Sequence, residues 1–265
     1  MSALHISLVA EPVFHIGSFA VTNSLLNACI AAIILSVGAL CLRLTIKPSG
    51  VPGHFQNALE GITETLLTYM DRVTGDHRKS VAFLPLIGSL FIFILLSNWM
   101  GLFPGTGSIL VHNGEEVAPL FRPATADLNL TIALALVAVA SSHIMGVVSL
   151  GLGKHLNKFI QLGTLWQALR TLSPIKILTA VIELGVGFLE LVGEFAKLAS
   201  LSLRLFGNVF AGEVLLTVLA SLIAYVLPLP FMLLEILVGL VQASVFAMLT
   251  LVYLSVMTKV PHEAH

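Results

Sequence analysis

The chain has 265 residues, of which 57% are hydrophobic and only 10% are Asp, Glu, Lys or Arg. A typical soluble domain carries about 25% charged residues, so a soluble chain of this composition could not cover its apolar surface. The formal net charge of −1 and the high apolar content exclude a disordered chain and a basic nucleic-acid-binding module. We therefore expect one membrane domain, residues 1–265, of the all-α polytopic class.

Three segments in the first half of the chain are long enough to span a membrane. A spanning helix needs about 20 mainly apolar residues, and three ranges meet this requirement: 19–42, 81–103 and 128–152. The second and third of these predict a vertical hairpin. The connecting residues 104–126 and 153–173 are predicted as loops, and Asp127 as the N-cap of the third span.

Residues 54–75 form a different kind of segment. Apolar residues recur there at helical spacing, and four charged residues stand between them: Glu60, Glu64, Asp71 and Arg72. We interpret the segment as an amphipathic helix along the membrane interface. A soluble surface helix would show the same pattern.

The last third of the chain predicts two helices that are too long for one perpendicular span. Residues 175–227 contain no Pro and no polar loop, and as one helix they would extend roughly 80 Å, against about 30 Å of hydrocarbon. The segment therefore either breaks into two pieces or lies strongly tilted. Pro228 and Pro230 predict a turn, after which residues 231–259 extend about 43 Å. The pattern favours a strongly tilted helical hairpin.

The distribution of basic residues predicts the orientation. Only Arg122 lies in a loop on one side of the predicted spans. Ten of the 13 basic residues lie on the other side: Arg43, Lys47, Arg72, Arg78, Lys79, Lys154, Lys158, Arg170, Lys176 and Lys259. The positive-inside rule places the N-terminus outside and the C-terminus in the cytoplasm. Because neither a basic signal region nor a transit peptide is visible, we expect a bacterial inner-membrane protein.

Arg204 is the most informative single residue, because it lies within an apolar run. A guanidinium keeps its charge at accessible pH, and at a bilayer centre it costs at least about 2.5–3.5 kcal/mol. A carboxylate partner or a water-filled cavity must offset this cost. An internal ion pair with Glu213 or Glu235 is the purely structural interpretation. We favour a functional one, because ionisable groups inside membranes mark transport pathways.

Helical spacing sorts the polar neighbours of Arg204 into two tracks. The first track is one stripe of the helix: Glu183, Glu190, Glu194, Lys197, Leu201, Arg204 and Asn208. Glu213 lies nine residues beyond Arg204 and therefore on the opposite face. A simpler interpretation of the first track is a salt bridge between Glu194 and Lys197 near the headgroups.

The final helix carries Glu235 and Gln242, which are seven residues apart and share one face. Taking a carboxyl group out of water favours its neutral form, so a carboxyl group in this position suits reversible protonation. If the hairpin brings Glu213 and Glu235 together, the two acids could relay a proton. His143, in the third span, is predicted to make a polar contact between helices.

Four ordered motifs carry a resemblance to a known family. Residues 202–213, SLRLFGNVFAGE, closely resemble the signature of subunit a of F-type ATP synthases. Three further stretches are similar to that family: 235–243 (EILVGLVQA) together with 249–254 (LTLVYL), 98–104 (NWMGLFP) and 123–129 (PATADLN). The resemblance covers about residues 19–260. In bacterial members, His is common at the position of Glu235.

The resemblance implies a proton-translocating stator subunit that offers two offset half-channels to the carboxylates of a rotating c ring. The position matching Arg204 faces those carboxylates and prevents a direct leak. The positions matching Asn208, Glu213, Glu235 and Gln242 line the outer proton path, and Glu190 belongs to the inner side. The implied partners are the c ring, the peripheral-stalk b subunits, other ATP synthase subunits and membrane lipid.

The sequence lacks a phosphate-binding loop and a nucleotide fold, so phosphate chemistry is expected in other subunits. No cofactor, metal site or nucleic-acid partner is expected. The alternative function is a self-contained ion-coupled transporter or channel, which would need a substrate site at a broken helix or a repeat interface. An intramembrane hydrolase would need a nucleophile with a base. The sequence shows neither arrangement.

Overall fold

The structure is a computed structural model, and it describes residues 10–17, 19–45, 53–103, 110–113, 116–120, 122–159, 174–223 and 226–259. Seven α-helices lie within these ranges: α1 Asn23–Thr45, α2 His54–Thr74, α3 His77–Met100, α4 Leu128–Leu150, α5 Leu152–Phe159, α7 Pro174–Leu222 and α8 Pro228–Met257. Five of them, α1, α3, α4, α7 and α8, are long and apolar enough to cross a membrane. The all-α polytopic class is therefore confirmed.

Two short antiparallel hairpins accompany the helices. β1 (Pro12–Ile16) pairs with β2 (Phe19–Thr22), and β4 (Leu110–Asn113) pairs with β5 (Glu116–Pro119). The first span was predicted from residue 19, but its helix begins at Asn23, because residues 19–22 pair as a strand. Residues 104–126 were predicted as a loop, and in their described part they hold β4, β5 and the 3₁₀ turn η1 (Ala124–Ala126).

Helix α2 has the predicted amphipathic character. Met70 is fully buried in a cluster with α3 and α8, while Glu60 and Glu64 face outward. Gly75 ends the helix at φ 69°, a left-handed conformation that glycine adopts without strain. Asp76 then caps α3 by accepting a hydrogen bond from the backbone N–H of Arg78. The placement of α2 along a membrane interface stays a prediction.

Helix α7 is continuous over 49 residues and so extends about 74 Å. Of the two options open for this segment, the unbroken helix is present. Helix α8 has 30 residues and extends about 45 Å. It begins at Pro228 rather than at residue 231, because Pro fits the first turn of a helix, where its missing N–H is not needed. Residues 224–225 lie outside the description.

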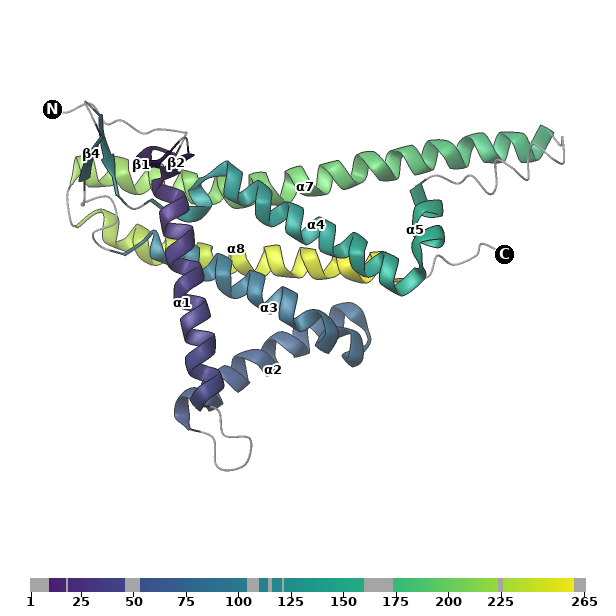
Figure 1. Cartoon of the computed structure of the whole chain (residues 1–265), viewed down its shortest axis with the longest axis horizontal. Coiled ribbons are helices and arrows are strands. Elements are labelled where there is room, and N and C mark those ends of the chain that lie inside the picture. The colour runs from purple at the N-terminus through teal and green to yellow at the C-terminus, as the bar shows by residue number, and fades with distance from the viewer. Residues whose placement is uncertain are drawn as a thin grey trace.

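The two long helices lie side by side and cross the direction of α1 steeply (Figure 1). A helix that exceeds the hydrocarbon thickness is accommodated by tilting. If α1 stands along the membrane normal, the α7–α8 hairpin slants strongly through the bilayer. This arrangement agrees with the hairpin expected from the sequence.

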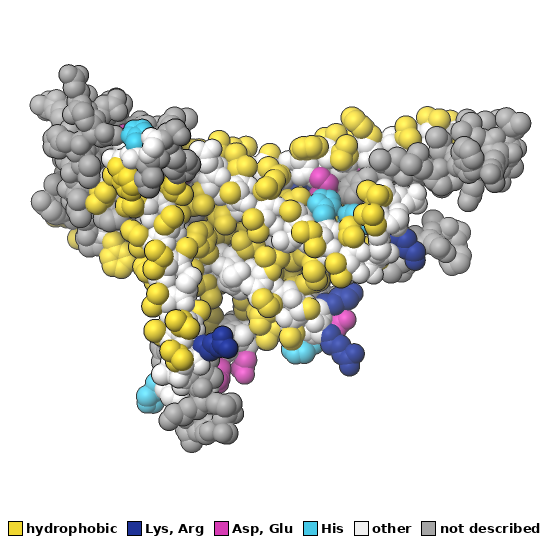
Figure 2. Space-filling view, viewed as in Figure 1, with side chains coloured by type: hydrophobic (Ala, Val, Ile, Leu, Met, Phe, Trp, Pro, Cys, Tyr) yellow, Lys and Arg dark blue, Asp and Glu magenta, His cyan; other side chains and the backbone are white. Residues whose placement is uncertain are grey.

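Four of the helices, α3, α4, α7 and α8, share one apolar core. Its buried residues are Leu90, Ile94, Ala135, Ala138, Leu201, Leu205, Ala243 and Phe246. Small residues let the helices approach closely. At Gly239 of α8, an added Cβ would stand 3.2 Å from the Cβ of Asn98. The outer surface remains largely apolar, as Figure 2 shows for one face, which suits contact with lipid.

Helix α5 corrects the prediction of a loop over residues 153–173. Residues 152–159 are helical, and Gly151 at φ 83° reverses the chain between α4 and α5. His155 of α5 is buried where it contacts Gly146 of α4. In the sequence, the few apolar residues of this short helix are interleaved with polar ones, so the helical pattern was not recognised. The remainder of the predicted loop, including Arg170, lies outside the described residues, as do Lys47 and Pro104.

Candidate functional site

Arg204 lies on the exposed flank of α7. Its neighbours Leu201 and Leu205 are buried in the four-helix core and hold the helix in place. The Nη2 of Arg204 donates to Ser200 Oγ at 3.4 Å, a long hydrogen bond. Within the described residues no ion pair reaches the guanidinium. The internal ion pair with Glu213 or Glu235 is therefore wrong.

Asn208, one turn beyond Arg204, connects α7 to α8. Its Nδ2 donates to Gln242 Oε1 at 2.8 Å. Gln242 is only 4% exposed, and its Nε2 has no hydrogen-bond partner among the described residues. A buried amide donor without a partner costs free energy unless water or another group satisfies it. The structure thus brings Arg204, Asn208 and Gln242 into one region.

Glu213 forms an ion pair with Arg122, which precedes η1. The Nε of Arg122 lies 3.0 Å from Oε1 and 3.1 Å from Oε2 of Glu213. Arg122 is 4% exposed, its Cζ lies 5.8 Å from the ring centroid of Phe210, and its carbonyl accepts from Asn27 Nδ2 of α1. A buried cation requires such partners.

Sequence reasoning used Arg122 only to orient the chain and missed its place in the site. The available indication was charge matching. Arg122 is the single basic residue predicted on the outer side, and Glu213 is an acid in an apolar run without a helical neighbour of opposite charge.

Glu235 reaches from α8 to the backbone of α7. A Cβ added at Gly212 would stand 2.5 Å from the carboxyl carbon of Glu235, so the carboxyl group as placed would have to shift if residue 212 carried a side chain. The hairpin therefore brings Glu235 to the residue next to Glu213. In the described chain no hydrogen bond joins the two carboxyl groups, so transfer between them requires a bridging water.

Helix α3 and η1 position this part of α8. Asn98 Nδ2 donates to the Gly239 carbonyl at 3.3 Å, and its Oδ1 accepts from Thr125 Oγ1 at 2.7 Å. Trp99 Nε1 donates to the Ile236 carbonyl at 3.1 Å. These bonds fix α8 between Glu235 and Gln242.

Asp127 has a local structural role. Its Oδ1 accepts from the backbone N–H of Asn129 at 2.9 Å, and its Oδ2 accepts from Ser24 Oγ at 2.8 Å. The predicted N-cap of α4 is thus confirmed.

The part of the first track that precedes Arg204 in α7 holds a second group of charges. The Nζ of Lys197 donates to Glu194 Oε1 at 2.6 Å, which confirms the salt bridge expected from their spacing. Glu190, one turn away, is half-buried. Across the residues that the structure describes, no group of three or more His, Cys, Asp and Glu side chains could hold a metal ion.

Comparisons with known proteins identify the relatives of this chain. Residues 25–255 match the family model described as ATP synthase A chain. The chain is 32% identical over 249 residues to ATP synthase subunit a of Mycobacterium ulcerans (strain Agy99), covering 92% of this chain and 90% of the relative. It is 34% identical over 225 residues to ATP synthase subunit a of Geotalea daltonii, covering 85% and 82%. It is 33% identical over 256 residues to ATP synthase subunit a 2 of Syntrophotalea carbinolica, covering 96% and 92%.

Proposed function

Since the chain belongs to the ATP synthase A chain family, and thus serves as a proton-translocating stator subunit in the membrane sector of an F-type ATP synthase, we propose how it performs this role. Two offset half-channels in the chain deliver protons to, and receive them from, the carboxylates of a rotating c ring. Arg204 stands between the half-channels.

The observation that carries this proposal is the open flank around Arg204. Leu203 beside it is 56% exposed, and a Cβ at Gly207 would meet nothing within 4 Å. The guanidinium has no ion-pair partner in the described chain, so its counter-ion must come from outside it. A carboxylate on a moving ring supplies that charge by Coulomb attraction. The fixed cation also prevents protons from passing straight through.

The remaining polar residues divide between the half-channels. We assign the outer half-channel to four residues around the hairpin: Asn208, Glu213, Glu235 and Gln242. Support comes from the hydrogen bond between Asn208 and Gln242 and from the contact of Glu235 with Gly212 beside Glu213. Glu190, which precedes Arg204 on the first track of α7, belongs to the inner half-channel. The peripheral-stalk b subunits and membrane lipid are the further partners of this family role.

A cross-link tests the ring-facing flank. In a chain whose native Cys29 and Cys41 are replaced by Ser, Gly207→Cys should form a disulfide with a cysteine placed beside the carboxylate of the c subunit. The reason is that position 207 faces open space. The measurement is the yield of the cross-linked product on a non-reducing gel of whole membranes.

The matched control is Ala138→Cys, since Ala138 is fully buried in the four-helix core and should give no product. Equal yields from positions 138 and 207, or no product at 207, would contradict the proposed ring face.

We further propose that the chain lies in a bacterial inner membrane with its N-terminus outside and its C-terminus in the cytoplasm. Basic side chains are exposed at the end of α1, at the start of α3 and on α5, and in the view of Figure 2 the dark-blue side chains lie along the lower and right edges. The positive-inside rule assigns that side to the cytoplasm. A tag with a protease cleavage site, fused to the C-terminus, should be cleaved by added protease in inverted vesicles and protected in spheroplasts. The opposite pattern would reverse the orientation.

A further inference from the structure

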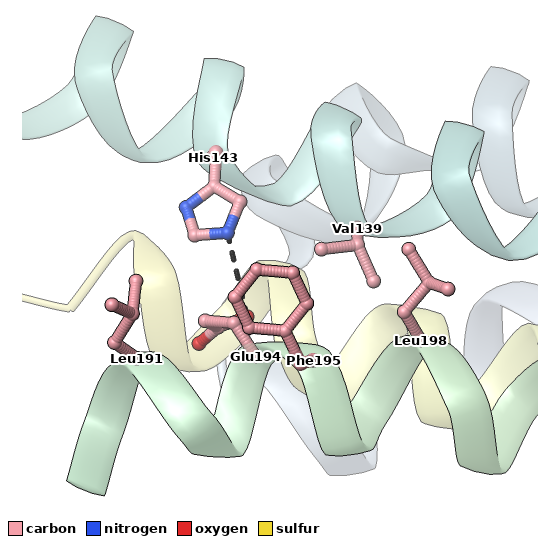
Figure 3. Close-up of a pocket in the computed structure, with 6 residues that line it drawn as sticks. All are labelled: Val139, His143, Leu191, Glu194, Phe195 and Leu198. Atoms are coloured by element: carbon pink, nitrogen blue, oxygen red, sulfur yellow. Dashed lines mark ion pairs between the residues drawn. The ribbon is translucent and has the colours of Figure 1, made fainter. Parts of the chain in front are cut away.

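A chain of polar contacts joins α7, α4 and α5 near the part of α7 that precedes Arg204. The Nε2 of His143 in α4 lies 3.4 Å from Glu194 Oε2 in α7 (Figure 3). The Nδ1 of His143 lies 3.2 Å from the Nε2 of His155 in α5, with the two rings edge to face. We call the three side chains Glu194, His143 and His155 the inner relay.

Two members of the inner relay, His143 and Glu194, border a pocket of about 240 Å³. Its other lining residues are apolar: Val139, Leu191, Phe195 and Leu198 (Figure 3). The volume is several times the roughly 30 Å³ that a water molecule occupies in the liquid. His143 is 30% exposed, whereas Glu194 is only 9% exposed. The buried acid therefore has a more accessible base beside it, at the edge of an open groove whose lining is mainly apolar.

The charged and titratable groups around this pair are contributed by each neighbouring helix. Lys197 of α7 donates to Glu194 Oε1, which leaves Oε2 directed toward His143. The Nζ of Lys197 lies 5.2 Å from the ring centroid of Tyr253 in α8. His155 approaches from α5, and Glu190 lies one turn from Glu194 on α7. The 3.4 Å between Glu194 and His143 and the 3.2 Å between His143 and His155 need only a small approach, or one bridging water, for a proton to pass along.

We propose that the inner relay carries protons out of the inner half-channel, an inference that rests on the proposed function. A proton released near Arg204 reaches Glu194 and moves from its Oε2 to the Nε2 of His143. The Nδ1 of His143 then releases its proton to His155 Nε2 or to water in the pocket. Only O–H and N–H bonds are exchanged, so the step needs no co-reactant.

The test uses inverted membrane vesicles in which the complete ATP synthase has assembled, and the variants are His143→Ala, His143→Gln and Glu194→Gln. The soluble sector is then stripped from the vesicles, and the passive proton flux through the membrane sector is measured across the pH range in which imidazole titrates. Each variant should lower the flux about 100-fold or more, because loss of a general acid–base group costs about 10²–10⁴-fold, and each should flatten the pH profile. The matched controls are His54→Gln and Glu64→Gln, exposed on α2, and both should behave like the unsubstituted chain.

Chemical rescue separates proton transfer from a structural role. Imidazole added to His143→Ala vesicles should enter the enlarged pocket and restore much of the flux, which a packing defect would not allow. Assembly is checked by the yield of the complex in mild detergent. If His143→Ala does not assemble, the pH profiles of His143→Gln and Glu194→Gln decide the question.

Unchanged flux and pH dependence in these variants, or no rescue of an assembled His143→Ala complex, would overturn the inner relay. Arg204→Ala is measured in parallel. If that variant still makes ATP normally, the proposed function itself fails. If it is inactive while the inner-relay variants are normal, only the inner relay is wrong.

Discussion

Vesicles whose stator chain carries Arg204→Ala should make no ATP from a proton gradient, although the complex still assembles. Arg204 is exposed, and its one hydrogen bond among the described residues is to Ser200, while Leu201 and Leu205 provide the packing of this turn. Loss of the guanidinium therefore removes the barrier and the counter-ion for the ring with little effect on folding. ATP synthesis is measured in energised inverted vesicles, and assembly by the yield of the purified complex.

The control for this variant is Ser200→Ala, which removes the 3.4 Å hydrogen bond and keeps the charge. It should retain most of the activity. Because the fixed cation no longer blocks protons, passive proton flux through Arg204→Ala vesicles should persist while synthesis is lost. Normal synthesis by an assembled Arg204→Ala complex would refute the role given to this residue.

Glu213→Gln should have the second largest effect, because it removes a proton-binding group and the anionic partner of Arg122 together. Removing one partner of a buried ion pair costs up to roughly 3–5 kcal/mol, and in this pair Arg122 is buried while the Glu213 side chain is 26% exposed. We expect a strong loss of proton flux together with a lower thermal stability of the complex. Flux is measured by the quenching of a pH-sensitive dye, and stability by the temperature at which the purified complex dissociates.

A double variant separates the two contributions. Arg122→Gln combined with Glu213→Gln leaves a neutral pair, which should recover stability without recovering flux, because no titrating group returns. Recovery of flux in the double variant would show that Glu213 acts only as the partner of Arg122. An unchanged flux in Glu213→Gln alone would remove this residue from the outer path.

Local pattern and length were sufficient to predict much of the fold. The apolar run without Pro predicted one or two helices, and the 49-residue α7 follows from it. The spacing of Glu194 and Lys197 predicted their salt bridge.

Contacts between distant segments were not predictable from one sequence. The pairing of Arg122 with Glu213 joins residues 91 positions apart, and no periodicity relates them. The contact of Glu235 with Gly212 depends on how the hairpin is packed. Helix α5 was missed because its eight residues are shorter than the window over which a helical pattern becomes clear.

The continuity of the long helices also bears on the competing function. A self-contained transporter commonly binds its substrate at discontinuous helices near the membrane midplane. In the described chain, α7 and α8 are unbroken from Pro174 to Leu222 and from Pro228 to Met257. The two helices therefore lack the broken-helix site that this alternative requires.

The absence of a side chain at Gly212 connects the substitutions allowed at position 212 with those allowed at position 235. The carboxyl group of Glu235 occupies the space that even one methyl group at residue 212 would fill, so a side chain at residue 212 would displace this carboxyl group. A relative with a side chain at the position of Gly212 must direct the group at the position of Glu235 elsewhere or replace it with a smaller one. The pair should therefore covary among related chains.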